Sequence, residues 1–170
     1  MTLSLYRMSI PALIRGLDNF SHILRRGADH AAQAALDADA LVQARLAEDM
    51  LPLAGQVQRA SDTAKFAAAR LAGIEAPSFP DDEATMAQLL ERIARTAAFL
   101  RGVREDDFPD DDDRQIAFRA GRHDLRMTAT DYVSTFALPN FYFHVATGYD
   151  ILRSRGVPLG KLDYLRGADA

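Results

Sequence analysis

Four long segments of this chain carry apolar residues at spacings of three and four, which is the pattern of helices that bury one face. The segments run over residues 4–26, 50–71, 83–101 and 128–155. Helices with this spacing pack together as bundles. We therefore expect an all-α chain that folds as a four-helix bundle and forms a single domain over residues 1–170.

The stretches between these segments also have interpretable patterns. A short connector helix is expected over residues 37–47, after the first helix ends at Gly27. Residues 116–119 and 124–127 are separated by a glycine and favour a small hairpin before the last helix. The connection between the third and fourth helices is long, which permits a topology other than up-down-up-down. The apolar tail, residues 159–165, is expected to fold back across the bundle.

Composition excludes several classes of function. The chain contains no cysteine, so disulfides, thiolate nucleophiles and zinc–thiolate sites are excluded. The net charge is −4 and only Lys65 and Lys161 are lysines, so the dispersed arginines give little drive for nucleic-acid binding. No apolar run reaches the roughly 18–20 residues of a membrane span. We expect a cytoplasmic protein with neither a nucleic-acid nor a membrane partner.

The last helix carries a polar pair where its apolar stripe should be. Asn140 and His144 are four residues apart, so they share one face of the helix. Leaving either side chain buried without a partner would cost about 1–3 kcal/mol. Pro139 should open a gap in the backbone hydrogen bonds one turn from His144. The predicted core stripe of this helix consists of Val133, Ala137, Asn140, His144, Thr147 and Ile151.

The second helix offers polar partners for this pair. Gln58 and Asp62 are four apart and share a face, whereas Gln56 and Gln58 flank Val57, so only one glutamine can point straight at the core. One interpretation is that a glutamine satisfies the pair and fixes the helix register. A second is a pocket for a small-molecule ligand, and a third is a metal site. The proposed pocket residues are His144, Asn140, Gln56, Gln58 and Asp62, with His144 and Asn140 as the metal ligands.

The last helix also carries a pattern that resembles a known superfamily. Asn140 and His144 are followed by Gly148, by the Leu152–Arg153 pair and by residues 156–158, which read Gly-Val-Pro. DinB-like four-helix bundles have two histidines four apart, then a glycine, a Leu-Arg pair and Gly-Val before a proline. Residues 46–65, 136–144 and 156–161 are similar to an uncharacterised bacterial branch of that superfamily, the domain of unknown function numbered nineteen-ninety-three.

The resemblance implies a metal site that this chain fills only in part. DinB-like relatives often bind a divalent metal through one histidine of the second helix and two of the fourth, and some use it for thiol transfer or hydrolysis. Here Asn140 replaces one histidine, and the second helix has no histidine. A neutral amide is a poor ligand for the metals that imidazole prefers. We therefore expect no cofactor, and the alternative is a divalent-metal-dependent enzyme with a degenerate site.

The aromatic residues of the last helix are too numerous for one inward face. They must pack on the tail, on the hairpin or on a second subunit, so a homodimer is one interpretation and coverage by the chain's own tail is the other. The residues concerned are Tyr132, Phe136, Phe141, Tyr142, Phe143 and Tyr149.

Overall fold

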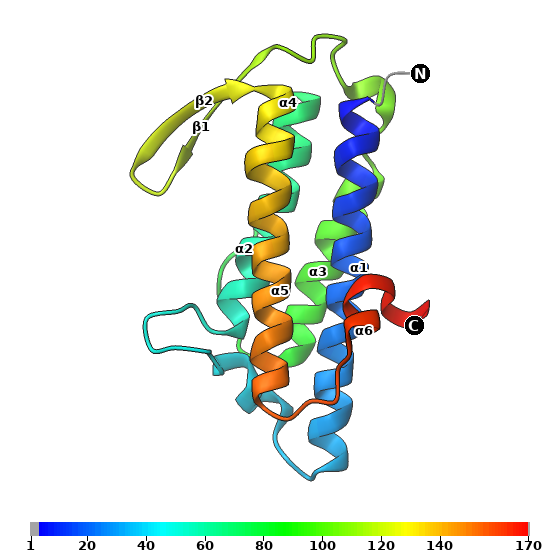
Figure 1. Cartoon of the computed structure of the whole chain (residues 1–170), viewed down its shortest axis with the longest axis vertical. Coiled ribbons are helices and arrows are strands. Elements are labelled where there is room, and N and C mark those ends of the chain that lie inside the picture. Colours follow the sequence, from blue (N-terminus) through cyan, green and yellow to red (C-terminus); the bar gives the residue numbers. More distant parts are fainter. Residues whose placement is uncertain (1–3, 170) are drawn as a thin grey trace.

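The computed structural model describes residues 4–169 as an elongated bundle of four long helices with a small hairpin at one end (Figure 1). The last long helix is continuous but consists of three segments, named α4, η3 and α5. The long helices are α1 (Leu5–Gln33), α2 (Leu53–Ala72), α3 (Met86–Arg101) and the composite of α4 (Ala129–Asp131), η3 (Tyr132–Ala137) and α5 (Leu138–Ser154). The predicted all-α four-helix bundle is confirmed.

Local capping explains most of the helix ends. The Ser4 side chain accepts a hydrogen bond from the Arg7 N–H at the start of α1, and Thr85 begins α3 with a capping box. Gly73 ends α2 in the left-handed conformation, with φ of 68°. The prediction that Gly27 ends the first helix is wrong, because α1 continues to Gln33 and Gly27 lies inside it, packed against Leu152.

The order of the helices departs from a simple up-and-down bundle. α1 and α5 run parallel, since Gly16 lies against Phe141 and Gly27 against Leu152. α2 runs antiparallel to α5, and α3 runs back towards the start of α1, where Glu105 accepts a hydrogen bond from Ser4. α2 and α3 are therefore parallel, and residues 74–85 return along the bundle to join them (Figure 1). The connection that permits this topology lies between α2 and α3, not between α3 and the last helix.

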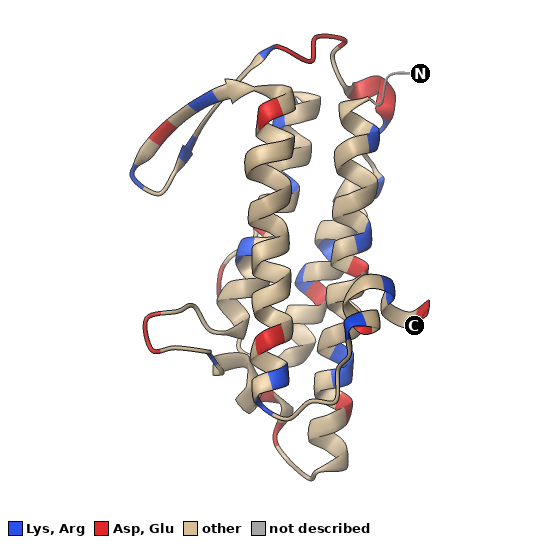
Figure 2. Ribbon diagram, in the orientation of Figure 1, with Lys and Arg blue, Asp and Glu red and all other residues tan. Residues whose placement is uncertain are grey.

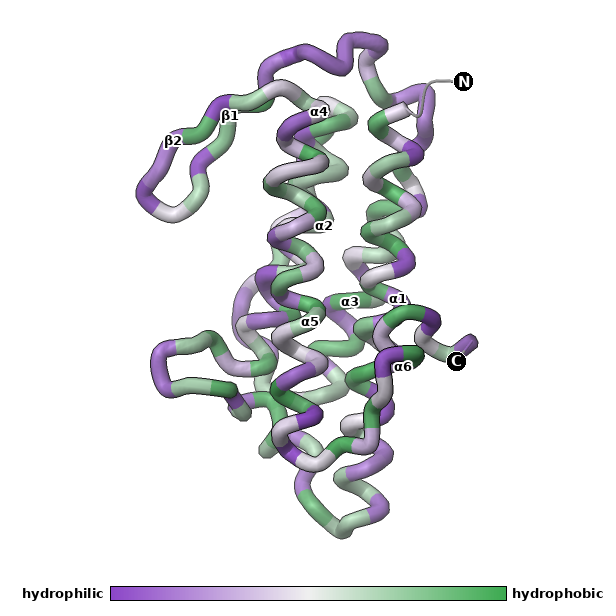
Figure 3. The backbone as a smooth tube through the Cα atoms, in the orientation of Figure 1, coloured by the Kyte–Doolittle hydropathy of each residue, from purple (hydrophilic) through white to green (hydrophobic). Residues whose placement is uncertain are grey.

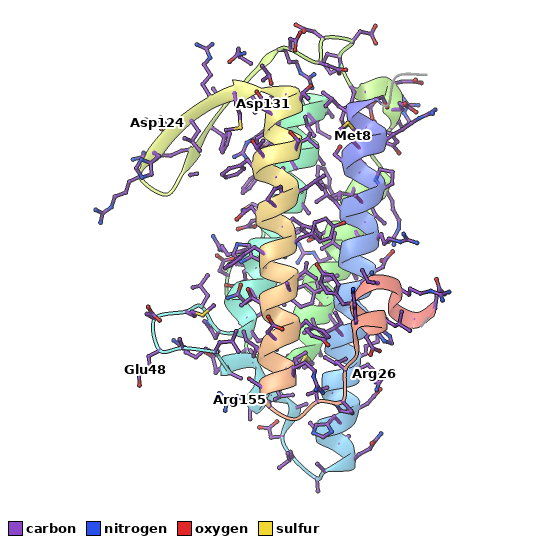
Figure 4. All side chains as sticks on the ribbon, viewed as in Figure 1. Met8, Arg26, Glu48, Asp124, Asp131 and Arg155 are labelled. Carbon is purple, nitrogen blue, oxygen red and sulfur yellow. The ribbon has the colours of Figure 1, made fainter. Side chains whose placement is uncertain are left out.

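Shorter elements cover the ends and one side of the bundle. The connector η1 (Ala38–Gln43) is a short 3-10 helix, and a short helical connector was predicted there. Strands β1 (Gln115–Ala120) and β2 (His123–Thr128) pair antiparallel, which confirms the hairpin, and it projects from the bundle around Asp124 (Figure 4). Helix α6 (Lys161–Arg166) packs on α1, so the predicted fold-back of the tail is also confirmed.

The backbone widens before Pro139, as its missing N–H predicts. Segment η3 is a π-helix, and the Leu138 N–H bonds to the Val133 carbonyl five residues back. A π-helix turns less per residue than an α-helix, so every residue after η3 is rotated relative to the sequence-based stripe. Phe141, Val145 and Gly148 turn inward on α5, while Val133, Ala137, Thr147 and Ile151 of the predicted stripe are buried as expected. The prediction that Asn140 and His144 belong to the core stripe is wrong for this reason, and both are half-buried at its edge.

Two glycine contacts bring α1 and α5 close together. The Phe141 ring lies over Gly16, and the Phe20 ring lies over Gly148, so closely that a Cβ atom at either glycine would overlap the ring. Both phenylalanines are completely buried. Apolar residues line the inner faces of the helices, and the loop above the bundle is hydrophilic (Figure 3). Of the helices within residues 4–169, none has the length and hydropathy of a membrane span.

Candidate functional site

His144 and Gln56 form the hydrogen bond at the centre of the candidate site. The His144 Nδ1 atom lies 2.8 Å from Gln56 Oε1, across the α2–α5 contact. Gln56 is only 2% exposed, and its Nε2 atom donates to the Leu51 carbonyl at 3.0 Å. The structure thus brings together two of the predicted site residues. This part of the polar pair is satisfied by a glutamine of the second helix.

The Gln56 contacts fix the tautomer of His144. Because the amide nitrogen of Gln56 is used on the Leu51 carbonyl, the atom facing the imidazole is the acceptor oxygen. The Nδ1 atom must then carry the proton and donate it. In the neutral ring the remaining nitrogen, Nε2, has a lone pair. Within residues 4–169 it makes no hydrogen bond, and it is not fully buried.

His144 is held in its neutral form. Burial, and to a smaller extent the positive charge of Arg59, together lower the pKa of the imidazole from 6.5 to about 4. The ring is therefore an acceptor through Nε2 at neutral pH rather than a cation. An uncharged imidazole of this kind can accept a hydrogen bond or a proton from a bound molecule.

Asn140 is the second polar group on this face of α5. Its amide nitrogen donates to the Thr63 hydroxyl of α2 at 2.8 Å. That bond orients the Asn140 side chain and leaves its carbonyl oxygen as a further acceptor. Asn140 and His144 each form one hydrogen bond to a side chain of α2, which positions both of them. Each also keeps one polar atom that can bind another partner.

A groove of about 470 Å³ lies beside these two side chains. It is bounded by α2, by the composite last helix and by the hairpin, which closes one end. Its lining includes Asn140, His144, Asp62 and Thr63, together with Leu51, Arg59, Phe66, Arg70, Phe118, Arg119, Ala120, Gly121, Tyr132 and Phe136. An aromatic surface with a few oriented polar groups is typical of sites for small molecules.

Aromatic rings and one arginine form the far wall of the groove. The Arg70 guanidinium lies 4.8 Å from the Phe118 ring centre and 5.2 Å from that of Phe66, and it donates to the Tyr132 hydroxyl at 3.0 Å. Phe118 contacts the Tyr132 and Phe136 rings at 5.0 and 4.7 Å. The hairpin is therefore attached to the last helix by edge-on and tilted contacts between aromatic rings. These contacts show that the aromatic excess of that helix packs partly on the hairpin.

Asp62 and Gln58, the other two predicted pocket residues, have other partners. Asp62 lines the groove, but its carboxylate is 3.0 Å from both Lys65 and Arg92. Gln58 is absent from the lining and donates to Glu83 at 2.9 Å. Burial alone would raise the pKa of Glu83, but hydrogen bonds from Arg92 and Gln58 hold it below its usual value. The structure brings His144, Asn140 and Asp62 to the groove. Gln56 does not line the groove but contacts His144 from behind it, and Gln58 lies outside it.

A buried ion-pair network supports the side of α2 next to the groove. Arg92 of α3 is 2% exposed and contacts Asp62, Asp81 and Glu83, while its Nη1 atom also donates to the Pro80 carbonyl at 2.9 Å. It thereby holds residues 74–85 against the bundle. The residues that the sequence analysis missed are Arg92 and the arginine–aromatic wall, because one arginine within an apolar stripe gives no sign of its partners.

The groove does not offer the ligand set of a typical metal site. Among residues 4–169, no three His, Cys, Asp or Glu side chains come together as a metal would require. The nearby donors are one imidazole, the neutral amide of Asn140 and the Asp62 carboxylate, which is already paired with three cations. Catalytic zinc sites normally use three stronger protein ligands. The residues present therefore fit a resident divalent metal poorly.

The fold and the groove define a DinB-like helical bundle with an altered site. The chain is similar to a DinB family member protein from Shewanella denitrificans, whose crystal structure superposes with a TM-score of 0.86. The two sequences are 38% identical, and the match covers 95% of this chain and 91% of the other. No curated protein matches the chain. Residues 5–165 match the family described as domain of unknown function DUF1993, and the chain belongs to that family.

Proposed function

We propose that this protein binds a small organic molecule in the groove between α2, α5 and the hairpin. The observation that carries the proposal is the fixed tautomer of His144. Gln56 occupies its Nδ1 atom at 2.8 Å, and Nε2 keeps its lone pair beside a groove of about 470 Å³. A buried glutamine that orients a single imidazole towards an open groove is better explained by ligand recognition than by helix register alone.

The lining favours a particular kind of ligand. A flat or aliphatic body would lie against Phe66, Phe118 and Phe136, and an N–H or O–H group of the ligand would donate to His144 Nε2. Arg70, which forms no ion pair within residues 4–169, favours a partial or full negative charge at the other end of the ligand, whereas Arg59 is already paired with Asp62 and Asp81. The only carboxylate of the lining, Asp62, is neutralised by Lys65 and Arg92 and therefore does not oppose that charge.

A divalent-metal-dependent enzyme, performing thiol transfer or hydrolysis, is the alternative that the family resemblance raises. Its support is the position of His144 on α5 beside Asn140 and Asp62. The donor set weighs against it, because it offers a single imidazole, a neutral amide oxygen of Asn140 that is a poor metal ligand, and a carboxylate of Asp62 that is already ion-paired. Titrating the protein with zinc separates the two proposals. One equivalent of bound metal that is lost in His144→Ala would favour the alternative.

The proposal is tested by screening aromatic fragments, neutral and anionic, with NMR detection of the His144 ring. Binding in the groove should move the Nε2 resonance of His144 more than its Nδ1 resonance. The same fragments should bind at least tenfold more weakly to Asn140→Ala and His144→Ala.

The matched control is His123→Ala, which removes an exposed histidine from the hairpin. It should leave fragment binding unchanged. Fragments that bind His144→Ala as well as the unmodified protein, or a screen in which the His144 ring never responds, would contradict the proposed function.

A further inference from the structure

A second groove lies on the surface of the bundle beside α1. It runs between α1, α3 and the C-terminal segment formed by α6 and η4 (Gly167–Asp169), and its volume is about 730 Å³. Its accessible apolar floor includes Pro11, Ile14 and Ala94. None of its lining residues lines the α2–α5 groove.

Four arginines from three elements line this second groove. Arg15 and Arg25 come from α1, Arg101 from α3 and Arg166 from α6. The α1 contribution follows from spacing, because Arg15, Asp18, His22 and Arg25 are separated by three, four and three residues and so lie on one face. Basic ribbon positions follow the outer side of α1 and continue at α6 (Figure 2).

The positive charge of this groove is only partly neutralised. Arg101 donates to both oxygens of Asp18, at 2.7 and 2.8 Å, and both side chains are about half exposed. Within residues 4–169, neither Arg15, Arg25 nor Arg166 forms an ion pair. The lining holds four arginines against two aspartates, Asp18 and Asp169, so it carries an excess of positive charge on a chain whose net charge is −4. The groove therefore attracts anions, although the whole protein does not.

The outer wall of the groove is fixed to α1 rather than loosely attached. The Asp163 carboxylate accepts hydrogen bonds from His22 at 2.8 Å and from Arg26 at 3.1 Å, while Asn19 donates to the Tyr164 carbonyl at 2.8 Å. Arg26 lies on α1 beside the returning chain (Figure 4). A ligand would enter a groove whose walls are already in place, so binding would not require ordering of the tail.

We propose that this groove binds an organic anion that has a carboxylate, sulfonate or phosphate head and an apolar body. The head would contact Arg15, Arg25 and Arg166, and the body would cover Pro11, Ile14 and Ala94. The anion would also compete with Asp18 for the Arg101 guanidinium. Arginine suits this role because its planar donors match the oxygens of such heads. The proposal is independent of the ligand in the α2–α5 groove.

The test is a fluorescence titration with anilinonaphthalenesulfonate, followed by competition with decanoate and with inorganic phosphate. The double variant Arg15→Gln/Arg25→Gln should bind the dye roughly tenfold more weakly, because it removes two charge-assisted contacts. Asp18→Asn should bind it roughly threefold more tightly, since Arg101 is then free for the anion. Decanoate should displace the dye at lower concentration than phosphate, because only decanoate can cover the apolar floor.

The matched control is Arg122→Gln/Arg126→Gln, which removes two exposed arginines from the hairpin and changes the net charge equally. It should bind the dye as the unmodified protein does. Equal weakening in both double variants, unchanged affinity in Asp18→Asn, or the absence of saturable dye binding would overturn the proposal. Loss of dye binding in His144→Ala would place the dye in the α2–α5 groove and would also overturn it.

Discussion

Acid should destabilise this protein through the protonation of His144. Burial lowers the pKa of this imidazole from 6.5 to about 4 in the folded protein, whereas the unfolded chain keeps the ordinary value. The unfolded state therefore binds the proton more readily below pH 6.5. The stability that His144 contributes is complete above that pH and is lost progressively as the pH falls towards 4.

The size of the effect follows from the two pKa values. One pKa unit is worth about 1.4 kcal/mol, so a shift from 6.5 to about 4 sets an upper limit of about 3 kcal/mol. His144 is only half-buried, and solvent screens part of this. We expect the neutral ring to account for about 1–3 kcal/mol of the loss in the free energy of unfolding between neutral pH and pH 4.

Urea unfolding as a function of pH measures this contribution. The comparison is between the unmodified protein and His144→Gln, which retains a hydrogen-bonding side chain but cannot titrate. The difference in free energy of unfolding between the two should shrink by about 1–3 kcal/mol as the pH falls from neutral to 4. His123→Gln, on the exposed hairpin, should track the unmodified protein. Parallel curves for His144→Gln and the unmodified protein, or an NMR titration of His144 near pH 6.5, would refute the reasoning.

Three further predictions concern the scaffold of the groove and the tail. Arg92→Met should lower the free energy of unfolding by about 1–3 kcal/mol, because it leaves the half-buried Glu83 carboxylate without its cation; unchanged stability in urea unfolding would contradict this. Gly148→Ala should cost about 1–3 kcal/mol despite the better helix propensity of alanine, since its Cβ atom would overlap the buried Phe20 ring; an unchanged or raised melting temperature would show that the contact adjusts freely. Asp163→Ala should make the C-terminal segment more sensitive to proteolysis, because the carboxylate caps α6 and binds His22; identical cleavage rates would argue against this attachment.

The bundle could be predicted because its determinants are local and periodic. The capping residues Ser4 and Thr85, the left-handed Gly73 and the alternating burial of β1 all act within a few residues of sequence. The hairpin followed from a glycine between two alternating stretches. The resemblance to the DinB-like superfamily predicted the same bundle, and the family match over residues 5–165 confirms that resemblance.

The direction in which Asn140 and His144 point could not be predicted from residue spacing alone. Spacing from Val133 places Asn140 and His144 in the core stripe, but the π-helix η3 rotates the rest of the helix and brings Phe141 and Val145 inward. Pro139 signalled a backbone gap without showing how it would be closed. The partner of His144 was predicted only as one of two glutamines. Tertiary packing decides between them, because Gln58 reaches Glu83 while Gln56 stays buried.

The Arg92 network lay beyond sequence reasoning for a different reason. Its members, Asp62, Asp81, Glu83 and Arg92, come from two helices and from the returning segment between them. Their association depends on the direction in which residues 74–85 run. The sequence pattern instead predicted that the unusual connection lay between the third and fourth helices. Homodimer formation and a cytoplasmic location stay predictions. Phe143 is 56% exposed and bears on the homodimer prediction, because an exposed aromatic ring could pack against a second subunit.

The protonation of the His144 ring nitrogens at neutral pH tests the account most directly. A long-range proton–nitrogen NMR spectrum distinguishes the two neutral tautomers and the imidazolium. The account predicts a neutral ring protonated at Nδ1, with Gln56→Leu shifting the population towards the other tautomer or the cation. A ring protonated at Nε2 in the unmodified protein would mean that no lone pair faces the groove, and the proposed recognition of a ligand by His144 would be wrong.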